Sequence, residues 1–87
     1  MTLAETTTMM VSCDYKERFK AEYYQLNIRL EKLSGMLEKW DNGTLEFTPT
    51  CDRTIYTDQM CAMFLYLQVL KRRAEIEGIE LEEGEEE

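Results

Sequence analysis

The side chains best suited to chemistry in this chain of 87 residues are basic and aromatic. Six of its ten basic residues fall in two short segments, around Arg18 and at Lys71-Arg72-Arg73, and four aromatic residues surround the first segment. Basic groups bind phosphate oxygens and flat rings stack on bases, which are the two contacts that a bound nucleotide needs. We take as candidate ligand-binding residues Tyr15, Lys16, Arg18, Lys20, Tyr24, Lys71, Arg72 and Arg73.

The same basic residues also allow a purely structural interpretation. Cations in the last turn of a helix complement its dipole and pair with acidic residues one turn away. The basic run at 71–73 has several such neighbours in the two predicted helices, namely Glu75, Glu77, Asp14 and Glu17. The sequence leaves the ligand-binding and the structural interpretation open.

Catalytic and metal-binding chemistry have few candidate groups. The chain has no histidine to act as a base near neutral pH, and no glycine-rich phosphate loop or nucleophile elbow. Cys13, Cys51 and Cys61 form no C-x-x-C pair, so we expect no zinc site. Their odd number, with no signal peptide ahead of them, argues against disulfides and favours a reducing compartment. We therefore expect a cytoplasmic protein that is not an enzyme and has neither metal nor other cofactor.

Charge and hydropathy limit the partners. The net charge is −8, but eight of the eighteen acidic residues lie between Glu75 and Glu87, so residues 1–74 carry ten acidic and ten basic residues. Such a block of like charge predicts a disordered acidic tail at 78–87, which would repel a double-stranded nucleic acid. No apolar run reaches the eighteen or so residues that span a bilayer. We expect neither a membrane nor a double-stranded nucleic acid as a partner.

Two apolar stripes predict an all-α fold. The first belongs to a helix at about 14–41, which begins at a capping box formed by Asp14 and Glu17, with Ser12 as a competing cap, and ends at Asn42-Gly43. The second belongs to a helix at about 53–77, with Asp52 or Thr54 as its cap. Members of each stripe stand three or four residues apart, as in a helical packing seam: Phe19, Tyr23, Leu26, Leu30, Leu33, Leu37 and Trp40, then Tyr56, Met60, Met63, Leu67, Leu70 and Ala74.

The connector, which contains Leu45, Phe47 and the single proline Pro49, is short enough to favour an antiparallel two-helix hairpin. In this hairpin Trp40 lies near Tyr56, and Phe19 and Tyr23 lie near Leu70 and Ala74. The six basic residues then meet at one end of the hairpin. Residues 1–13 form an N-terminal arm, residues 14–77 the hairpin domain, and residues 78–87 the tail.

The second helix is apolar on more than one side, whereas a hairpin covers only one side of each helix. The residues left uncovered would form a large exposed apolar patch on a monomer, which indicates self-association into a homo-oligomeric helical bundle. These residues are Cys61, Phe64, Leu65 and Val69 on the second helix and Tyr24, Ile28 and Met36 on the first.

The two helical segments resemble a specific family. The pattern E-R-x-x-x-E-Y-x-x-L-x-x-R-x-x-K-L runs from Glu17 to Leu33, and Q-x-x-A-M-x-x-Y-L-x-V-L-x-x-R runs from Gln59 to Arg73. Over residues 14–81 the chain resembles short phage proteins known as crAss-phage related proteins. That family is similar in fold to phage sponges that counter CBASS and Thoeris immunity by sequestering cyclic oligonucleotides or cyclic ADP-ribose derivatives. The resemblance implies a homo-oligomer, commonly a hexamer, that binds its ligand at subunit interfaces without cleaving it.

The expected function is therefore that of a phage anti-defence sponge, which binds a small anionic nucleotide signal in the cytoplasm of an infected bacterial host cell. The alternative is a helical protein-interaction module that binds a host or phage protein through the apolar face of the second helix. Met60 and Met63 suit such an adaptable surface.

Overall fold

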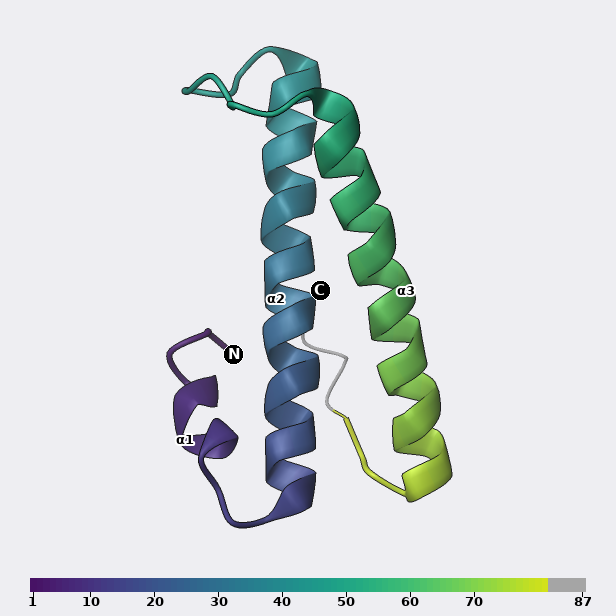
Figure 1. Ribbon diagram of the computed structural model, residues 1–87. Coiled ribbons are helices and arrows are strands. Elements are labelled where there is room, and N and C mark those ends of the chain that lie inside the picture. Colours follow the sequence, from purple (N-terminus) through teal and green to yellow (C-terminus); the bar gives the residue numbers. More distant parts are fainter. Residues whose placement is uncertain (82–87) are drawn as a thin grey trace.

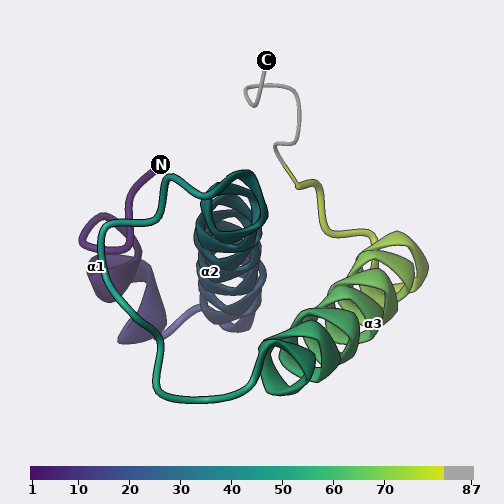
Figure 2. The same cartoon turned by 90° about the horizontal axis from the view of Figure 1, so that it is seen from above.

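The computed structural model describes residues 1–81, and within this range the chain is all-helical, with three helices and no strand. The helices are α1 (Thr6–Met10), α2 (Tyr15–Asn42) and α3 (Arg53–Glu77). Helices α2 and α3 lie side by side and run in opposite directions, and α1 packs on the side of α2 that faces away from α3 (Figures 1 and 2). The bounds of the two long helices agree with the predicted ranges to within one residue.

The start of α2 is capped differently from the predicted capping box. The Asp14 carboxylate accepts a 3.0 Å hydrogen bond from the backbone N–H of Lys16, as an N-cap should. The backbone N–H of Asp14, however, donates to the hydroxyl of Ser12 at 3.0 Å and not to Glu17. The reciprocal half of the capping box is therefore wrong, because the Ser12 hydroxyl, two residues before Asp14, takes this donor instead.

Both long helices end in a Schellman motif centred on a left-handed glycine. At the end of α3, Gly78 has φ of 73°, its N–H donates to Glu75, and the N–H of Ile79 donates to the carbonyl of Ala74 at 2.8 Å. Gly43, with φ of 76°, ends α2 in the same way, as the sequence predicted. For α3 the predicted side-chain cap is absent, since the N-cap residue Asp52 makes no side-chain hydrogen bond to the helix.

The core lies where α2 and α3 face each other, toward the end of the pair at which α2 begins and α3 ends. Phe19 and Tyr23 pack there against Leu70 and Ala74, as the predicted stripes required, and Leu70 is only 1% exposed. Burying one such side chain contributes about 1.5–3 kcal/mol relative to leaving it in water. The buried members of the cluster are Phe19, Tyr23, Tyr24, Leu26, Leu67, Leu70, Ala74 and Ile79.

The N-terminal arm is an ordered part of this fold. Thr6 of α1 is fully buried, donates to the carbonyl of Leu3 at 2.6 Å, and accepts a 2.8 Å hydrogen bond from the amide of Gln25. Ile28 and Met36 of α2 are half-buried, and Tyr24 is buried as a member of the core cluster. The prediction that all three would belong to an exposed patch is therefore wrong for Tyr24, since the chain itself covers this ring.

Three residues of the predicted acidic tail, 79–81, follow α3 directly. Ile79 is 6% exposed and belongs to the core cluster, and Leu81 packs against that cluster. The chain leaving α3 turns back along the pair of long helices (Figure 1), so residues 79–81 are part of the fold and not of a disordered tail. The remainder of the predicted tail, 82–87, lies outside the described residues.

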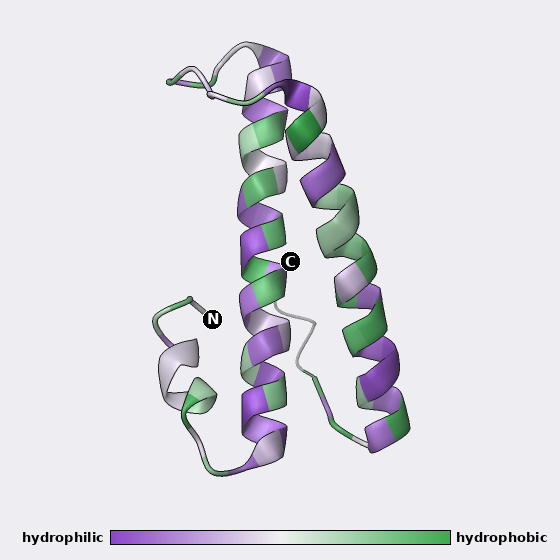
Figure 3. Ribbon diagram, viewed as in Figure 1, coloured by the Kyte–Doolittle hydropathy of each residue, from purple (hydrophilic) through white to green (hydrophobic). Residues whose placement is uncertain are grey.

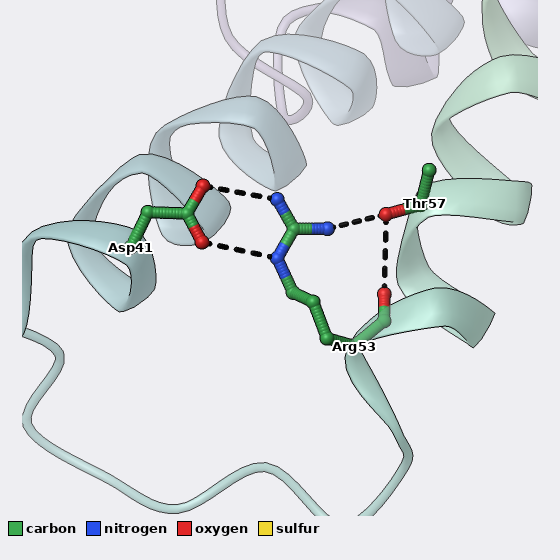
Figure 4. Close-up of polar contacts among 3 residues, drawn as sticks. All are labelled: Asp41, Arg53 and Thr57. Carbon is green, nitrogen blue, oxygen red and sulfur yellow. Dashed lines mark hydrogen bonds and ion pairs between the residues drawn. The ribbon is translucent and has the colours of Figure 1, made fainter.

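At the connector end, one arginine joins the last turn of α2 to the first turn of α3. The guanidinium of Arg53 donates two hydrogen bonds, of 3.2 and 3.1 Å, to the two carboxylate oxygens of Asp41 and a third to the hydroxyl of Thr57 (Figure 4). It also lies 5.9 Å from the ring centre of Trp40, which meets Tyr56 edge-to-face at 5.8 Å as predicted. The Arg53 guanidinium holds the pKa of Asp41 below its ordinary value, mainly through these hydrogen bonds.

The connector itself covers little of the core, because Phe47 is 57% exposed and Leu45 half-buried. Among residues 1–81, no helix is both long and apolar enough to cross a membrane.

Candidate functional site

The predicted basic end is where the first turn of α2 meets the last turns of α3. Arg73 donates a 2.7 Å hydrogen bond to the hydroxyl of Tyr15, which in turn donates to the Glu77 carboxylate at 2.9 Å. Arg73 also pairs directly with Glu77 at 3.2 Å and lies 4.9 Å from the ring centre of Phe19. The hydrogen bond that Arg73 donates to the Glu77 carboxylate is the main reason that the pKa of Arg73 is raised above its ordinary value. The structure thus brings Arg73 and Tyr15 together, but their polar groups are hydrogen-bonded to each other and to Glu77.

A second contact bridges the same side of the helix pair two turns further along. The hydroxyl of Tyr66 on α3 donates a hydrogen bond to the carboxylate of Glu22 on α2. That bond, more than burial or the negative charge of Glu22, raises the pKa of Tyr66 above its ordinary value of 10.0. Glu22 follows Tyr15 by seven residues, and Tyr66 precedes Arg73 by seven, so both pairs bridge one side of the α2–α3 pair. We call this the paired side.

Three further predicted site residues are placed away from any shared pocket. Arg18 donates a 2.8 Å hydrogen bond to the carbonyl of Ser12 and so holds the turn that leads into α2. The ring of Tyr24 is buried and meets Tyr23 edge-to-face at 5.5 Å. Arg72 is exposed and stands two residues from both Leu70 and Ala74, roughly 200° round the helix from the face turned to α2. The hairpin model could not place these residues, because it lacked α1 and the turn before α2.

The opposite side of the helix pair carries an apolar hollow of about 530 Å³. We call it the open groove; its walls come from both helices and are Leu30, Ser34, Met60, Cys61, Phe64 and Leu65. Phe64 is 52% and Leu65 65% exposed, so large apolar surfaces face this hollow without being covered. The sequence indicated Cys61, Phe64 and Leu65 as uncovered apolar surface and Leu30 and Met60 as members of the two predicted stripes. The hollow between them depends on the angle between the two helices, which no periodicity gives.

Polar and basic residues continue the walls of the open groove toward the basic end. On α2, Ser34, Asn27 and Lys20 stand seven residues apart and therefore share a face, and Lys16 lies one turn before Lys20. On α3, Phe64, Gln68 and Lys71 follow one another at spacings of four and three residues and therefore share one face. Asn27 and Gln68 are half-buried, and their amides make no hydrogen bond within the part of the chain that the structure describes.

A second hollow, of about 280 Å³, lies further along this face of α3. It is lined by Lys71, Ala74, Glu75, Ile79 and Leu81, so the chain that turns back after α3 forms one of its walls. Lys71 contributes a positive charge here and Glu75 a negative one. Lys16 is exposed and Lys20 half-exposed, and neither makes an ion pair within residues 1–81. The lysines of the predicted site therefore gather on the groove side, whereas its Tyr15 and Arg73 belong to the paired side.

The side chains gathered here are basic, amide and apolar groups. Within the described residues no three histidine, cysteine or acidic side chains are placed to hold a metal ion, and Cys13, Cys51 and Cys61 are all exposed thiols.

A family model described as Sequestin matches residues 13–76, which is most of the chain and includes α2, the connector and nearly all of α3. The chain belongs to the Sequestin family. No curated protein and no solved structure matches it at a significant level.

The name Sequestin indicates sequestration of a ligand, which agrees in general terms with the sponge-like function expected from the sequence. The segment matched by the Sequestin model contains Lys16, Lys20 and Lys71 together with every wall of the open groove. It ends before Gly78, so the Schellman motif and the returning chain lie beyond the matched segment.

Proposed function

We propose that this member of the Sequestin family binds and holds a small anionic nucleotide signal and so acts as an anti-defence sponge in phage-infected bacteria. The ligands that fit the proposal are cyclic oligonucleotides and cyclic ADP-ribose derivatives. The observation that carries it is the open groove, in which an apolar hollow of about 530 Å³ continues into amides and lysines along the same two helix faces. A base needs an apolar wall and amide partners, and its phosphates need cations.

The residues divide this work between them. Phe64 and Leu30 give the apolar surface on which a base can lie. Asn27 and Gln68, whose amides are half-buried, offer donors and acceptors to the base edge. Lys16 and Lys20 supply charge to phosphate oxygens, with no acidic partner of their own to displace within the described residues.

The proposal includes no chemical step. The chain lacks histidine altogether, and the carboxylates of Glu22 and Glu77 are engaged by Tyr66, Tyr15 and Arg73 on the paired side. Affinity alone suffices for a sponge, because free signal has only to stay below the threshold of its receptor. Nanomolar affinity corresponds to about −12 kcal/mol. A single open groove supplies few walls for such binding, which favours an oligomer in which neighbouring subunits complete the site.

A protein-interaction module remains the second candidate, on the observation that Phe64, Leu65 and Val69 of α3 are each more than half exposed. A partner helix could cover them. This candidate requires no affinity for nucleotides and no role for the lysines of α2.

Titration calorimetry with a panel of cyclic dinucleotides, cyclic trinucleotides and cyclic ADP-ribose isomers tests the proposal. We expect at least one member to bind the wild-type protein and the double variant Lys16→Glu/Lys20→Glu to lose that binding. The matched control is Lys32→Glu, an exposed residue of α2 outside the groove faces, which should bind as the wild type does. Absence of binding by every member, or equal loss in the control, would reject the proposal in favour of the protein-interaction module.

A further inference from the structure

Helix α3 carries a second stripe on the side turned away from α2. Its members stand three or four residues apart, which makes it a complete helical seam like the one that faces α2. They are Ile55, Asp58, Ala62, Leu65, Val69, Arg72 and Ile76. We call this set the outer stripe.

All seven members of the outer stripe are exposed. Among its large apolar residues the exposed fraction is 53% at Ile55, 65% at Leu65, 54% at Val69 and 79% at Ile76. Figure 3 shows hydrophobic residues along the middle of α3, whereas polar residues interrupt α2 throughout. Five apolar residues in a seam on a helix that spans the whole molecule form a surface of the kind that another helix covers.

The outer stripe is complementary to itself when read backwards. Asp58 lies seven residues before Leu65 and Arg72 lies seven residues after it. Ala62 lies three residues before Leu65, and Val69 lies four residues after it. Ile55 lies ten residues before Leu65, and Ile76 lies eleven residues after it. Two copies of α3 placed antiparallel about a two-fold axis at Leu65 therefore bring acid against base and apolar against apolar at every level.

The parallel arrangement has the opposite property. Asp58 would face its own copy and so would Arg72, which places like charges against each other at two levels. Neither side chain forms an ion pair within the described part of its own chain, so both are available to a partner. An interface in which residue i meets residue j, and j meets i, is what a two-fold axis requires.

We infer that a second copy of this chain docks on the outer stripe, with the two α3 helices antiparallel, Leu65 at the two-fold axis, and Asp58 of each copy paired with Arg72 of the other. The stripe runs over about 32 Å of helix. Seven residues a side is fewer than the 20–30 or so of a standard interface, so the dimer dissociates at micromolar concentrations. The inference stands independently of which ligand the open groove binds.

The dimer also bears on the groove. Leu65 belongs both to the outer stripe and to the wall of the open groove, so the partner helix borders the groove where the single chain leaves it uncovered. Arg72, one of the predicted ligand-binding residues, is assigned to the interface by this geometry.

Sedimentation velocity of charge-exchange variants tests the inference. Asp58→Arg and Arg72→Asp each place like charges across the axis twice, and each should weaken the wild-type dimer by about tenfold or more. The exchange variant Asp58→Arg/Arg72→Asp should restore the dimer, because both pairs reform with reversed sign. The control Asp58→Arg/Lys32→Asp has the same net charge as the exchange variant but no new pair, and it should remain as weak as Asp58→Arg. Circular dichroism confirms that each variant is folded, as expected for substitutions at exposed positions.

Cross-linking tests the orientation. In a background with all three native cysteines replaced by serine, Ile55→Cys protein mixed with Ile76→Cys protein should cross-link, and Ile55→Cys protein alone should not. The inference would be overturned if the wild type is a monomer, or if Asp58→Arg does not weaken the dimer. It would also be overturned if the exchange variant does not restore association, or if Ile55→Cys protein cross-links to itself. An unrestored exchange variant would point instead to a different protein as the occupant of the stripe.

Discussion

The hydroxyl of Tyr15 lies 2.7 Å from a guanidinium nitrogen of Arg73, although 58 positions separate the two residues in the chain. This contact ties the first turn of α2 to the last turns of α3 at the end where the helices carry most of their basic residues. It also divides the cations there into two groups. Arg73 is engaged with Tyr15, Glu77 and the ring of Phe19, whereas Lys16 and Lys20 have no ion pair within residues 1–81.

Replacement of Tyr15 by phenylalanine tests the structural role of this contact. Tyr15→Phe removes the hydroxyl that bridges Arg73 and Glu77, so we expect the melting temperature to fall by a few degrees while ligand affinity stays unchanged. Thermal unfolding followed by circular dichroism measures the first effect and calorimetry the second. Tyr56→Phe is the control, because its hydroxyl makes no hydrogen bond within the described residues. A loss of ligand binding without a loss of stability would show that Tyr15 contacts the ligand.

The bond between Asp41 and Arg53 gives stability a specific dependence on pH. In the folded state the pKa of Asp41 lies below its ordinary value of 3.8. The bond therefore stabilises the fold fully at pH values above 3.8, and this stabilisation is lost as the pH falls through the lowered pKa. Asp41→Asn should therefore reduce the melting temperature at neutral pH, and the difference from the wild type should shrink in acid. Glu46→Gln, at an exposed connector residue without hydrogen bonds in the described chain, should show no such difference. A gap between Asp41→Asn and the wild type that persists in acid would contradict this account.

Replacement of glycine by alanine should have opposite effects on stability at two positions. Gly78→Ala forces a Cβ into a left-handed conformation with φ of 73° and should destabilise the fold by about 1 kcal/mol. Gly35→Ala lies inside α2, where nothing stands within 4 Å of the added Cβ, and should stabilise it by roughly 0.5–1 kcal/mol. Chemical denaturation of both variants at one protein concentration measures the difference. A shift in the same direction for both would contradict the Schellman geometry at Gly78.

The periodicity of the sequence predicted the long helices because their seams are uninterrupted and their ends carry strong signals. Phe19 meets Ala74, and Trp40 meets Tyr56, because three- and four-residue spacings place these side chains on facing stripes. The same reasoning missed α1, since five residues rich in threonine have no measurable period and are held by tertiary contacts such as that of Thr6 with Gln25.

The candidate site was predicted in part. The basic residues could be gathered at one end from the direction of the helices alone, but which of them pair internally depends on side-chain reach. Arg73 lies one turn before Glu77 and opposite Tyr15 and contacts both, whereas Lys20 forms no ion pair among the residues described. The open groove could not be predicted, because its depth follows from how far α2 and α3 separate and from the size of the side chains between them.

Recovery of bound ligand tests the central claim most directly. The wild-type protein is dialysed against the nucleotide panel, washed, denatured by heat, and the released material is identified by chromatography and mass spectrometry. The account predicts that one nucleotide is depleted in proportion to the protein and is returned chemically intact, and that Lys16→Glu/Lys20→Glu returns none. Recovery of no nucleotide from the wild type, or recovery of a cleaved product, would contradict it.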